Sequence, residues 1–343
     1  MRIRRLVGAL LLLAALAVAV AAYLYYSLEH PRRPEKPSTV TILFPQGTTT
    51  AQIFHKLAES GVVHDGRMAE VYYRLYRSRT RLQAGEYIFD KPMPIDDVIN
   101  RMGRGEVVKY SVVVPDGLTA EESFQLFWSR GIGGPEGFQR AFRDRPLLPE
   151  LTGVSDLEGF LFPDTYLVTR STPARAIVEM MVAEFRKNFL PEMREKAERL
   201  GLTLVQAVTL DSIIEKESAL PREGPAVASV YLNRLKRGMR LQADPTVIYA
   251  LRRDKKWTGT LHRSDYAYES PYNTYVSEGL PPGPICNPGL NALKWAVAPA
   301  RTDYLYFVAD ASGGHRFSRT FEEHLAAIAA ARRQRAENGA SQD

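Results

Sequence analysis

Apolar and polar residues recur along this chain with the periods of short strands and of amphipathic helices. Strands are predicted at 39–44, 85–89, 107–114 and 304–309. Helices are predicted at 48–60, 66–77, 95–102, 172–189, 224–237, 245–251 and from residue 320 onwards, and one more begins at residue 204 and ends before Pro221. This pattern predicts an α+β fold in which small strand-and-helix modules precede a mainly helical domain with a small sheet.

The first apolar stretch differs from the others because residues 6–28 contain no charged side chain. It is longer than the ~20 residues that a helix needs to cross a bilayer. Three arginines precede it and three tyrosines lie near its end, which is the order expected when the N-terminus stays in the cytoplasm. We therefore expect a single transmembrane helix at 6–28. A cleaved signal peptide is the alternative, although its apolar core usually has only ~7–15 residues; in either case the body is exported.

A weak internal repeat relates two segments of the first half. ILFPQGTTTAQIFHKLAESGV, from Ile42, aligns with VVVPDGLTAEESFQLFWSRGI, from Val112. Each copy predicts a strand, a Pro-x-Gly turn, a threonine cap, an amphipathic helix and a terminating glycine. The order strand-helix-helix-strand resembles the LysM module, which binds the glycan backbone of peptidoglycan or chitin. Generic α+β packing is the alternative interpretation.

The predicted helix that begins at residue 204 carries the strongest candidate for catalysis. Glu215 and Glu217 are two residues apart, so on a helix they point in nearly opposite directions and cannot act as a pair on one bond. At about 100° per residue, Glu217 lies between Leu210, Ile213 and Ile214. Aliphatic surroundings disfavour an ionised carboxylate and raise its pKa, as a general acid requires. Glu217 is the candidate acid; an ion pair with a nearby arginine or lysine is the alternative.

Two further segments offer groups suited to a groove. Gln242 has no obvious structural task, whereas Asp244 is interpreted as a helix N-cap followed by a proline at the first helical position. Glu158 lies within the aromatic and proline-rich segment LEGFLFPDTYLV and is a second groove candidate.

A tyrosine-rich segment and a rigid loop follow. Tyr272, Asn273 and Tyr275 in PYNTY offer ring faces and an amide for sugar rings and N-acetyl groups. The segment GLPPGPICNPG, with four prolines and three glycines in eleven residues, must be a loop. We expect this loop to wall a site, with a purely structural corner as the alternative.

Composition excludes several other classes of protein. The 343 residues allow two domains after an anchor, and the single cysteine, Cys286, excludes an intramolecular disulfide and a cysteine-based zinc cluster. Of the net charge of +6, residues 1–40 supply +4, from six basic and two acidic side chains. The rest of the chain is nearly neutral, so no nucleic acid partner is expected. His315 and His324 lack metal-ligand spacing, and phosphate and dinucleotide motifs are absent, so no metal and no cofactor are expected.

In this order, SIIEKES, LNRLKRGMRLQADPTVIYAL, YNTY, GLPPGPICNPG and YLYFVAD resemble the YceG-like endolytic murein transglycosylases, over roughly residues 155–330. The resemblance implies that Glu217 is catalytic and that Ser218 completes a Glu-Ser pair like that of soluble lytic transglycosylases. It also implies a carbon–oxygen lyase that cuts the MurNAc-β-1,4-GlcNAc bond of nascent strands without water and leaves 1,6-anhydroMurNAc ends. Glu158, Ser218, Gln242, Tyr272, Asn273 and Tyr275 are then the candidate substrate-binding residues.

Two other functions stay open beside this one. A hydrolytic muramidase would use Glu158 or Asp244 as a second carboxylate. A non-catalytic scaffold would bind glycan through the N-terminal region without a product that depends on Glu217.

The expected domain order runs from a cytoplasmic tail to a disordered end. Its ranges are 1–5 for the tail, 6–28 for the membrane helix, 29–38 for a proline-rich linker, 39–152 for a LysM-like region, 153–332 for the catalytic domain and 333–343 for the disordered end. The catalytic domain is expected on the extracytoplasmic side of the cytoplasmic membrane. Expected partners are peptidoglycan glycan strands and the membrane, with peptidoglycan synthases of the elongation or division machinery as candidates.

Overall fold

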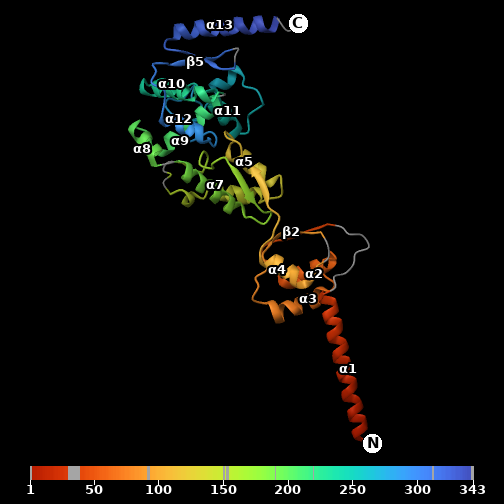
Figure 1. Cartoon of the computed structure of the whole chain (residues 1–343). Coiled ribbons are helices and arrows are strands. Elements are labelled where there is room, and N and C mark those ends of the chain that lie inside the picture. The colour runs from red at the N-terminus through yellow and green to blue at the C-terminus, as the bar shows by residue number, and fades with distance from the viewer. Residues whose placement is uncertain are drawn as a thin grey trace. The chain divides into compact units, whose positions relative to one another are not determined.

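The chain divides into two compact units in a computed structural model (Figure 1). The structure describes residues 2–29, 39–90, 93–149, 151, 154–189, 191–218, 220–310 and 313–340, so nearly all of the predicted linker at 29–38 lies outside the described residues. The first unit comprises Met1–Ser111 and Leu167–Thr172, and the second comprises Val112–Tyr166 and Pro173–Asp343. Helices combined with small two-stranded sheets confirm the predicted mixture of α and β structure.

The first unit follows the predicted order of strand, two helices and strand. Its elements are α1 (Arg2–Glu29), β1 (Val40–Phe44), α2 (Thr50–Glu59), α3 (Gly66–Tyr72) with a π-helical turn (Tyr73–Arg77), β2 (Gly85–Phe89) and α4 (Ile95–Gly103). β1 pairs antiparallel with β2, with Val40 opposite Phe89. Alternate strand residues and one face of each of α2 and α4 are buried in a common core that includes Phe44, Phe54 and Met102. Whether this unit is a LysM-like module stays a prediction.

The helix α1 includes the apolar stretch that was predicted to cross a membrane. Its side chains at Leu10 to Leu13 are exposed. Taking only the residues that the structure describes, no helix combines sufficient length with sufficient apolar character to span a membrane.

Both copies of the internal repeat fold as predicted, but they belong to different units. Gly47 and Gly117 in the two turns have φ of 85° and 77°, a region that glycine enters without steric cost. Thr49 and Thr119 each cap the following helix, and each forms a capping box with the side chain three residues later. The second copy provides β3 (Tyr110–Val113) and α5 (Ala120–Trp128).

The predicted domain boundary near residue 153 is therefore placed differently by the structure. The chain passes from one unit to the other within β3 and returns within β4 (Thr165–Val168), and these two strands pair with each other. The second repeat copy is built into the second unit, where Phe124 of α5 stacks on Phe138 at 4.7 Å between ring centroids. Because the boundary falls inside strands, no linker composition marks it.

The second unit is mainly helical with one C-terminal hairpin. Its remaining elements are α6 (Pro135–Phe142), a 3₁₀ turn (Arg145–Leu147), α7 (Ala174–Asn188), α8 (Pro191–Arg199), α9 (Leu204–Glu217), a 3₁₀ turn (Pro221–Glu223), α10 (Gly224–Lys236), α11 (Asp244–Arg253), a 3₁₀ turn (Arg263–Ala267), α12 (Leu290–Val297), β5 (Tyr306–Ala309), β6 (His315–Ser318) and α13 (Phe321–Ala340). β5 pairs antiparallel with β6, and α13 lies beside β5 (Figure 1).

The helix α9 forms the centre of this unit. It is in contact with α8, α10, α11 and α12, and every residue from 207 to 214 is buried. The expected amphipathic pattern is therefore not observed, since a helix surrounded by other helices is buried on all sides. The polar residues inside it are accommodated locally: the Thr209 hydroxyl donates to the Val205 carbonyl at 2.7 Å, and the Ser212 hydroxyl donates to the Thr209 carbonyl at 2.7 Å.

The C-terminal helix continues beyond the predicted end of the ordered domain at residue 332. α13 reaches Ala340, and the expected disorder from residue 333 stays a prediction. Residues 331–337 read ARRQRAE, and alanine, arginine, glutamine and glutamate all have high intrinsic helix propensity.

Candidate active site

A cavity of about 260 Å³ lies at the C-terminal end of α9. It collects side chains from α9, α10, the start of α11, the tyrosine-rich loop, β5 and α13. The lining residues are Glu217, Tyr231, Arg234, Leu241, Gln242, Asp244, Tyr275, Phe307 and His324. Three of the residues predicted from the sequence, Glu217, Gln242 and Tyr275, are thus brought together.

Glu217 is the last residue of α9, because Ser218 leaves helical geometry with ψ of 90°. Its Oε1 accepts a hydrogen bond of 3.0 Å from the Tyr231 hydroxyl. Burial is the main reason that the pKa of Glu217 is raised to about 7. The charge of Asp244 adds to this rise, whereas the Tyr231 hydrogen bond and the charge of Arg234 oppose it. A carboxyl group with this pKa carries a proton in a large fraction of molecules at neutral pH, which allows it to act first as an acid and then as a base.

The ion-pair interpretation of Glu217 is not supported by the neighbouring arginine. The Arg234 guanidinium donates to the carbonyls of Leu305 at 2.7 Å and Leu241 at 2.8 Å, and it lies 5.1 Å from the ring centroid of Tyr306. Within the described residues, no salt bridge joins Glu217 to any lysine or arginine. Arg234 therefore acts on Glu217 through the electrostatic field and holds three chain segments together.

Asp244 lies in the same cavity rather than capping a helix. The N-cap of α11 is Ala243, one residue before the predicted cap, and it makes no side-chain cap bond. The Asp244 carboxylate instead accepts hydrogen bonds from the hydroxyls of Tyr275 at 2.5 Å and Tyr266 at 3.3 Å. A second carboxylate is thus available near Glu217, held by two tyrosines.

Gln242 enters the cavity from a strained backbone. Its φ is 49°, in the left-handed region that residues other than glycine rarely adopt. The conformation is held by a hydrogen bond of 3.1 Å from its N–H to the Thr274 carbonyl. Such strain costs about 1–3 kcal/mol and is concentrated at functional sites, which supports the prediction that Gln242 serves the site.

Glu158 is placed away from this cavity. It lines two other cavities, of about 710 and 240 Å³. One of its oxygens accepts from the Ala120 N–H at 2.8 Å, at the start of α5, and the other accepts from the Tyr249 hydroxyl at 3.3 Å. Burial raises the pKa of Glu158 to about 8. These contacts hold the start of α5 and Tyr249 of α11 together within the second unit, and they lie outside the cavity that contains Glu217.

Three further residues predicted to bind substrate, Tyr272, Asn273 and Ser218, are not among the residues that line the Glu217 cavity. Tyr272 packs on Tyr249 at 5.0 Å and lines the smaller of the two Glu158 cavities. Asn273 is fully buried, and its amide donates to the carbonyls of Tyr266 and Tyr268, so it braces the tyrosine-rich loop. The Ser218 hydroxyl is buried without a hydrogen-bond partner among the described residues, and its predicted contact with substrate stays a prediction.

The loop GLPPGPICNPG supports α9 instead of walling the cavity. The Ser212 hydroxyl accepts from the Ile285 N–H at 3.0 Å, and Glu215 accepts from the Gly289 N–H at 3.0 Å. The Asn287 side chain accepts from the N–H groups of Gly159 and Leu161 at 3.0 and 3.1 Å. Pro282, Gly283 and Pro284 of the loop do line the smaller of the two Glu158 cavities, so the loop walls a cavity other than the one that holds Glu217. Glu215 is part of the support of α9.

Sequence reasoning did not identify five of the lining residues as site residues: Tyr231, Arg234, Leu241, Phe307 and His324. Tyr231 and Arg234 are three apart on α10, so their side chains share one face, and this spacing was a usable signal. Phe307 and His324 reach the cavity only through the packing of β5 and α13, for which the sequence gives no local sign.

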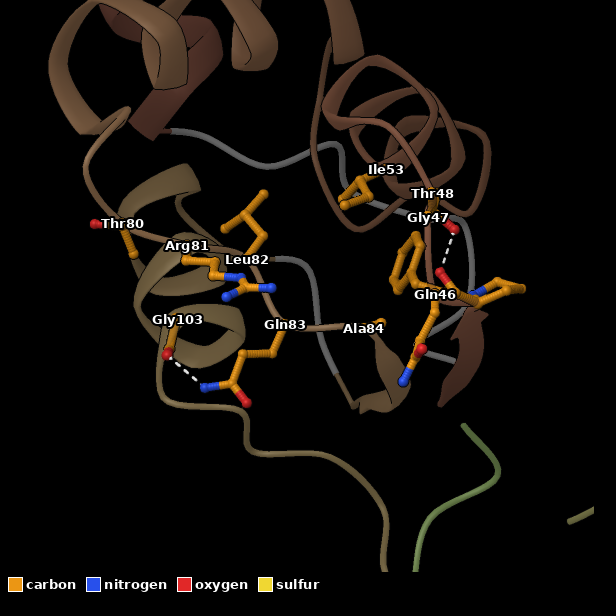
Figure 2. A pocket seen from close by; sticks show the side chains of 12 residues that line it. Gln46, Gly47, Thr48, Ile53, Thr80, Arg81, Leu82, Gln83, Ala84 and Gly103 are labelled. Atoms are coloured by element: carbon orange, nitrogen blue, oxygen red, sulfur yellow. Dashed lines mark hydrogen bonds between the residues drawn. The ribbon is translucent and has the colours of Figure 1, made fainter. Parts of the chain in front are cut away.

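A larger cavity, of about 790 Å³, lies in the first unit (Figure 2). It is bounded by the turn of the first repeat copy, with Gln46, Gly47 and Thr48, and by residues 80–84 before β2. Its lining has no carboxylate, so it lacks a group for acid catalysis. In the described part of the chain, no cluster of three or more His, Cys, Asp or Glu residues could hold a metal ion.

Comparison with known proteins identifies the family of this chain. The model of the YceG-like family matches residues 42–330. A Bacillus subtilis protein named endolytic murein transglycosylase is 30% identical over 88% of this chain and 88% of its own length. A Streptococcus pneumoniae protein of the same name is 30% identical over 80% of this chain but 55% of its own length, so this chain spans about half of that relative.

One solved structure is similar along most of its length. A YceG-like protein of Listeria monocytogenes aligns with a TM-score of 0.53 at 30% identity, over 84% of this chain and 99% of that protein. Since both the family model and the relatives match most of the sequence, this chain belongs to the YceG-like family.

Proposed function

We propose that this protein is a murein lytic transglycosylase, a lyase that acts on peptidoglycan, with Glu217 as its single acid and base. The observation that carries the proposal is the Glu217 carboxyl group with a pKa of about 7, held by Tyr231 in a cavity with Gln242 and Tyr275. The names of the relatives, which are endolytic murein transglycosylases, support the substrate.

The proposed reaction uses one carboxyl group twice. Protonated Glu217 donates its proton to the glycosidic oxygen as the bond from C1 of MurNAc to O4 of GlcNAc breaks. The 6-hydroxyl oxygen of the same MurNAc then bonds to C1, and its proton passes to the Glu217 carboxylate. The carboxyl group is thereby restored, and the product carries a 1,6-anhydro ring. Intramolecular attack can reach an effective molarity on the order of 10⁵ M, so no second carboxylate is needed to activate water.

A hydrolytic muramidase is the competing enzyme, and Asp244 is the observation that favours it. Asp244 lines the cavity with Glu217, whereas Glu158 does not, so only Asp244 stays available as a base for water. Both Asp244 oxygens already accept tyrosine hydroxyl groups, which leaves less of the carboxylate free to bind water.

The decisive experiment is digestion of purified sacculi, with product masses determined for wild type and Glu217→Gln. We expect anhydromuramoyl products from wild type and a loss of at least about 10³-fold in the variant, with folding intact. Products heavier by one water, with reducing ends, would identify a hydrolase. Wild-type activity in Glu217→Gln would remove Glu217 from its role.

The cavity of the first unit supports a second part of the proposal, a glycan-binding LysM-like module. In the second repeat copy, the Gly117 N–H donates to the Asn287 carbonyl and the Leu118 carbonyl accepts the Asn287 N–H. In the first copy the equivalent groups, the N–H of Gly47 and the carbonyl of Thr48, have no hydrogen-bond partner among the described residues and border the open cavity (Figure 2). An N-acetyl amide could satisfy such a donor and acceptor pair.

Binding of the full-length Glu217→Gln protein to insoluble peptidoglycan tests this part. Ala84→Trp places a large ring into the cavity, and Ala51→Trp on α2 adds the same ring at an exposed position. We expect reduced binding for the first change and unchanged binding for the second. Equal binding by both variants would reject a glycan site in the first unit.

We also propose that the protein acts on the extracytoplasmic side of the cytoplasmic membrane, anchored by residues 6–28. The uncharged stretch and the arginines before it support this location. Peptidoglycan synthases are the proposed neighbours there. Membrane fractionation of the full-length chain, followed by proteolysis from the outer face, would test the location; recovery of the intact chain in the cytosol would reject it.

A further inference from the structure

Three rings form a cluster beside the Glu217 cavity. Tyr306 of β5 lies 5.1 Å from His324 and 5.9 Å from Phe321, both of α13, measured between ring centroids, and Phe321 lies 6.4 Å from His324. The Tyr306 and His324 rings are nearly parallel, with 20° between their planes. We call Tyr306, Phe321 and His324 the ring cluster.

The ring cluster is firmly positioned but partly exposed. The first turn of α13 is fixed by the Thr320 hydroxyl, which accepts the Glu323 N–H at 3.1 Å, and by the Glu323 carboxylate, which accepts the Arg319 N–H at 2.7 Å. Phe321 is nevertheless 58% exposed, and Leu325, one turn later on the same face, is 51% exposed. A rigid aromatic surface open to solvent is the geometry on which the C–H face of a sugar ring stacks.

His324 connects this surface to the catalytic cavity. It lines the cavity with Glu217 and belongs to the ring cluster. Its Nδ1 is buried and has no hydrogen-bond partner in the described part of the chain. Burial and, to a smaller extent, Arg234 lower the pKa of His324, so the ring is neutral at pH 7 and can exchange a hydrogen bond with an uncharged hydroxyl or acetamido group.

We propose that the ring cluster is a saccharide-binding subsite that continues from the Glu217 cavity and holds the next sugar of the glycan strand. This inference rests on the proposed function, because it takes the occupant of the cavity to be glycan. Phe321 supplies the stacking surface, and His324 supplies a hydrogen bond at the junction with the cavity. The continuity of the two through His324, a polar ring that lines the cavity and packs in the ring cluster, favours a sugar over an apolar protein segment.

The test compares kcat and KM on glycan strands of defined and increasing length. Phe321→Ala should raise KM about tenfold on long strands, with kcat within about twofold of wild type and anhydro products retained. Phe321→Trp should restore the low KM, because indole offers an equal or larger stacking face. The matched control is Leu167→Ala on β4, which removes an apolar side chain that is 60% exposed and should leave both constants unchanged. An unchanged KM for Phe321→Ala at every strand length would overturn the subsite.

His324 is tested by rescue. His324→Ala should raise KM, and His324→Gln, which keeps a donor and an acceptor of similar reach, should recover part of the loss. Equal defects in both variants, with equal melting temperatures, would overturn the hydrogen bond.

If wild type gives no anhydromuramoyl product, the proposed reaction fails, and the subsite is then judged by binding alone. In the Glu217→Gln background, weaker binding of glycan strands by Phe321→Ala supports the subsite, and unchanged binding rejects it.

Discussion

The Tyr231 hydroxyl donates a hydrogen bond of 3.0 Å to Oε1 of Glu217 and so joins α10 to the last residue of α9. This bond stabilises the ionised carboxylate, while burial stabilises the protonated acid. A group that must give a proton and take one back needs both influences, since either alone would hold it in one state.

Tyr231→Phe should remove the hydrogen bond and keep the ring. We expect the pKa of Glu217 to rise further, because the main contact that favours its ionised form is lost. Because Glu217 must be protonated to act first, the alkaline limb of the profile of kcat/KM against pH should move to higher pH, and the maximal rate should fall by about 10- to 100-fold. An unchanged profile would show that the Tyr231 hydroxyl has no part in the reaction.

The raised pKa of Glu217 also predicts a cost in stability. The native state holds this proton up to about pH 7, whereas the ordinary pKa of an exposed glutamate is 4.5. The stabilisation linked to the bound proton is therefore complete below pH 4.5 and is lost as the pH rises through 7. Glu217→Gln should raise the free energy of unfolding at pH 8 by up to about 3 kcal/mol and change it little at pH 4. Urea unfolding at the two pH values measures this, and an equal effect at both would contradict it.

Asp244→Asn separates the two candidate reactions. In a lytic transglycosylase the variant keeps anhydro products and loses at most about tenfold in rate, since Asp244 acts only through the field at Glu217 and through its tyrosine partners. Because Asp244 raises the pKa of Glu217, the pH optimum should also move downward. Abolished activity, with hydrolytic products from wild type, would instead assign Asp244 as the base. Mass spectrometry of the digests gives the answer.

Gly224 at the start of α10 is predicted to tolerate no side chain. A Cβ at this position would lie 2.1 Å from Cδ2 of Trp295 on α12. Gly224→Ala should therefore destabilise the protein by about 1–3 kcal/mol, and activity should fall with it, because a shift of α10 moves Tyr231 and Arg234. The control is Gly134→Ala, at an extended N-cap where the nearest atom lies 4.0 Å away. Similar melting temperatures for the two variants would contradict the prediction.

Residues whose roles depend on their own helix were predictable from the sequence. Helical geometry alone separates Glu217 from Glu215, and the structure places the first in a cavity and the second under a loop. The turns and caps of both repeat copies were predictable for the same reason, since Pro-x-Gly and threonine caps act locally.

Roles that depend on distant packing could not be predicted. The residues that flank Asn273 in the sequence do not tell whether its amide contacts a sugar or its own loop. In the structure it donates hydrogen bonds to carbonyls of its own loop. Asp244 precedes a proline, as a helix cap often does. Its role in the cavity depends on hydrogen bonds from Tyr275 and Tyr266, which lie in other segments of the chain. The division between the two units could not be predicted from the sequence, because it passes through strands whose composition is not that of a linker.

The position of His324 has a consequence for how the catalytic cavity is assembled during synthesis. Glu217 and His324 are separated by more than a hundred residues, yet both are walls of one small cavity. In a nascent chain that has folded α9 and α10, Glu217 is already in place beside Tyr231. One side of the cavity stays open until α13 packs on the hairpin of β5 and β6. The cavity that holds Glu217 is therefore complete only after residues more than a hundred positions downstream have been made and packed.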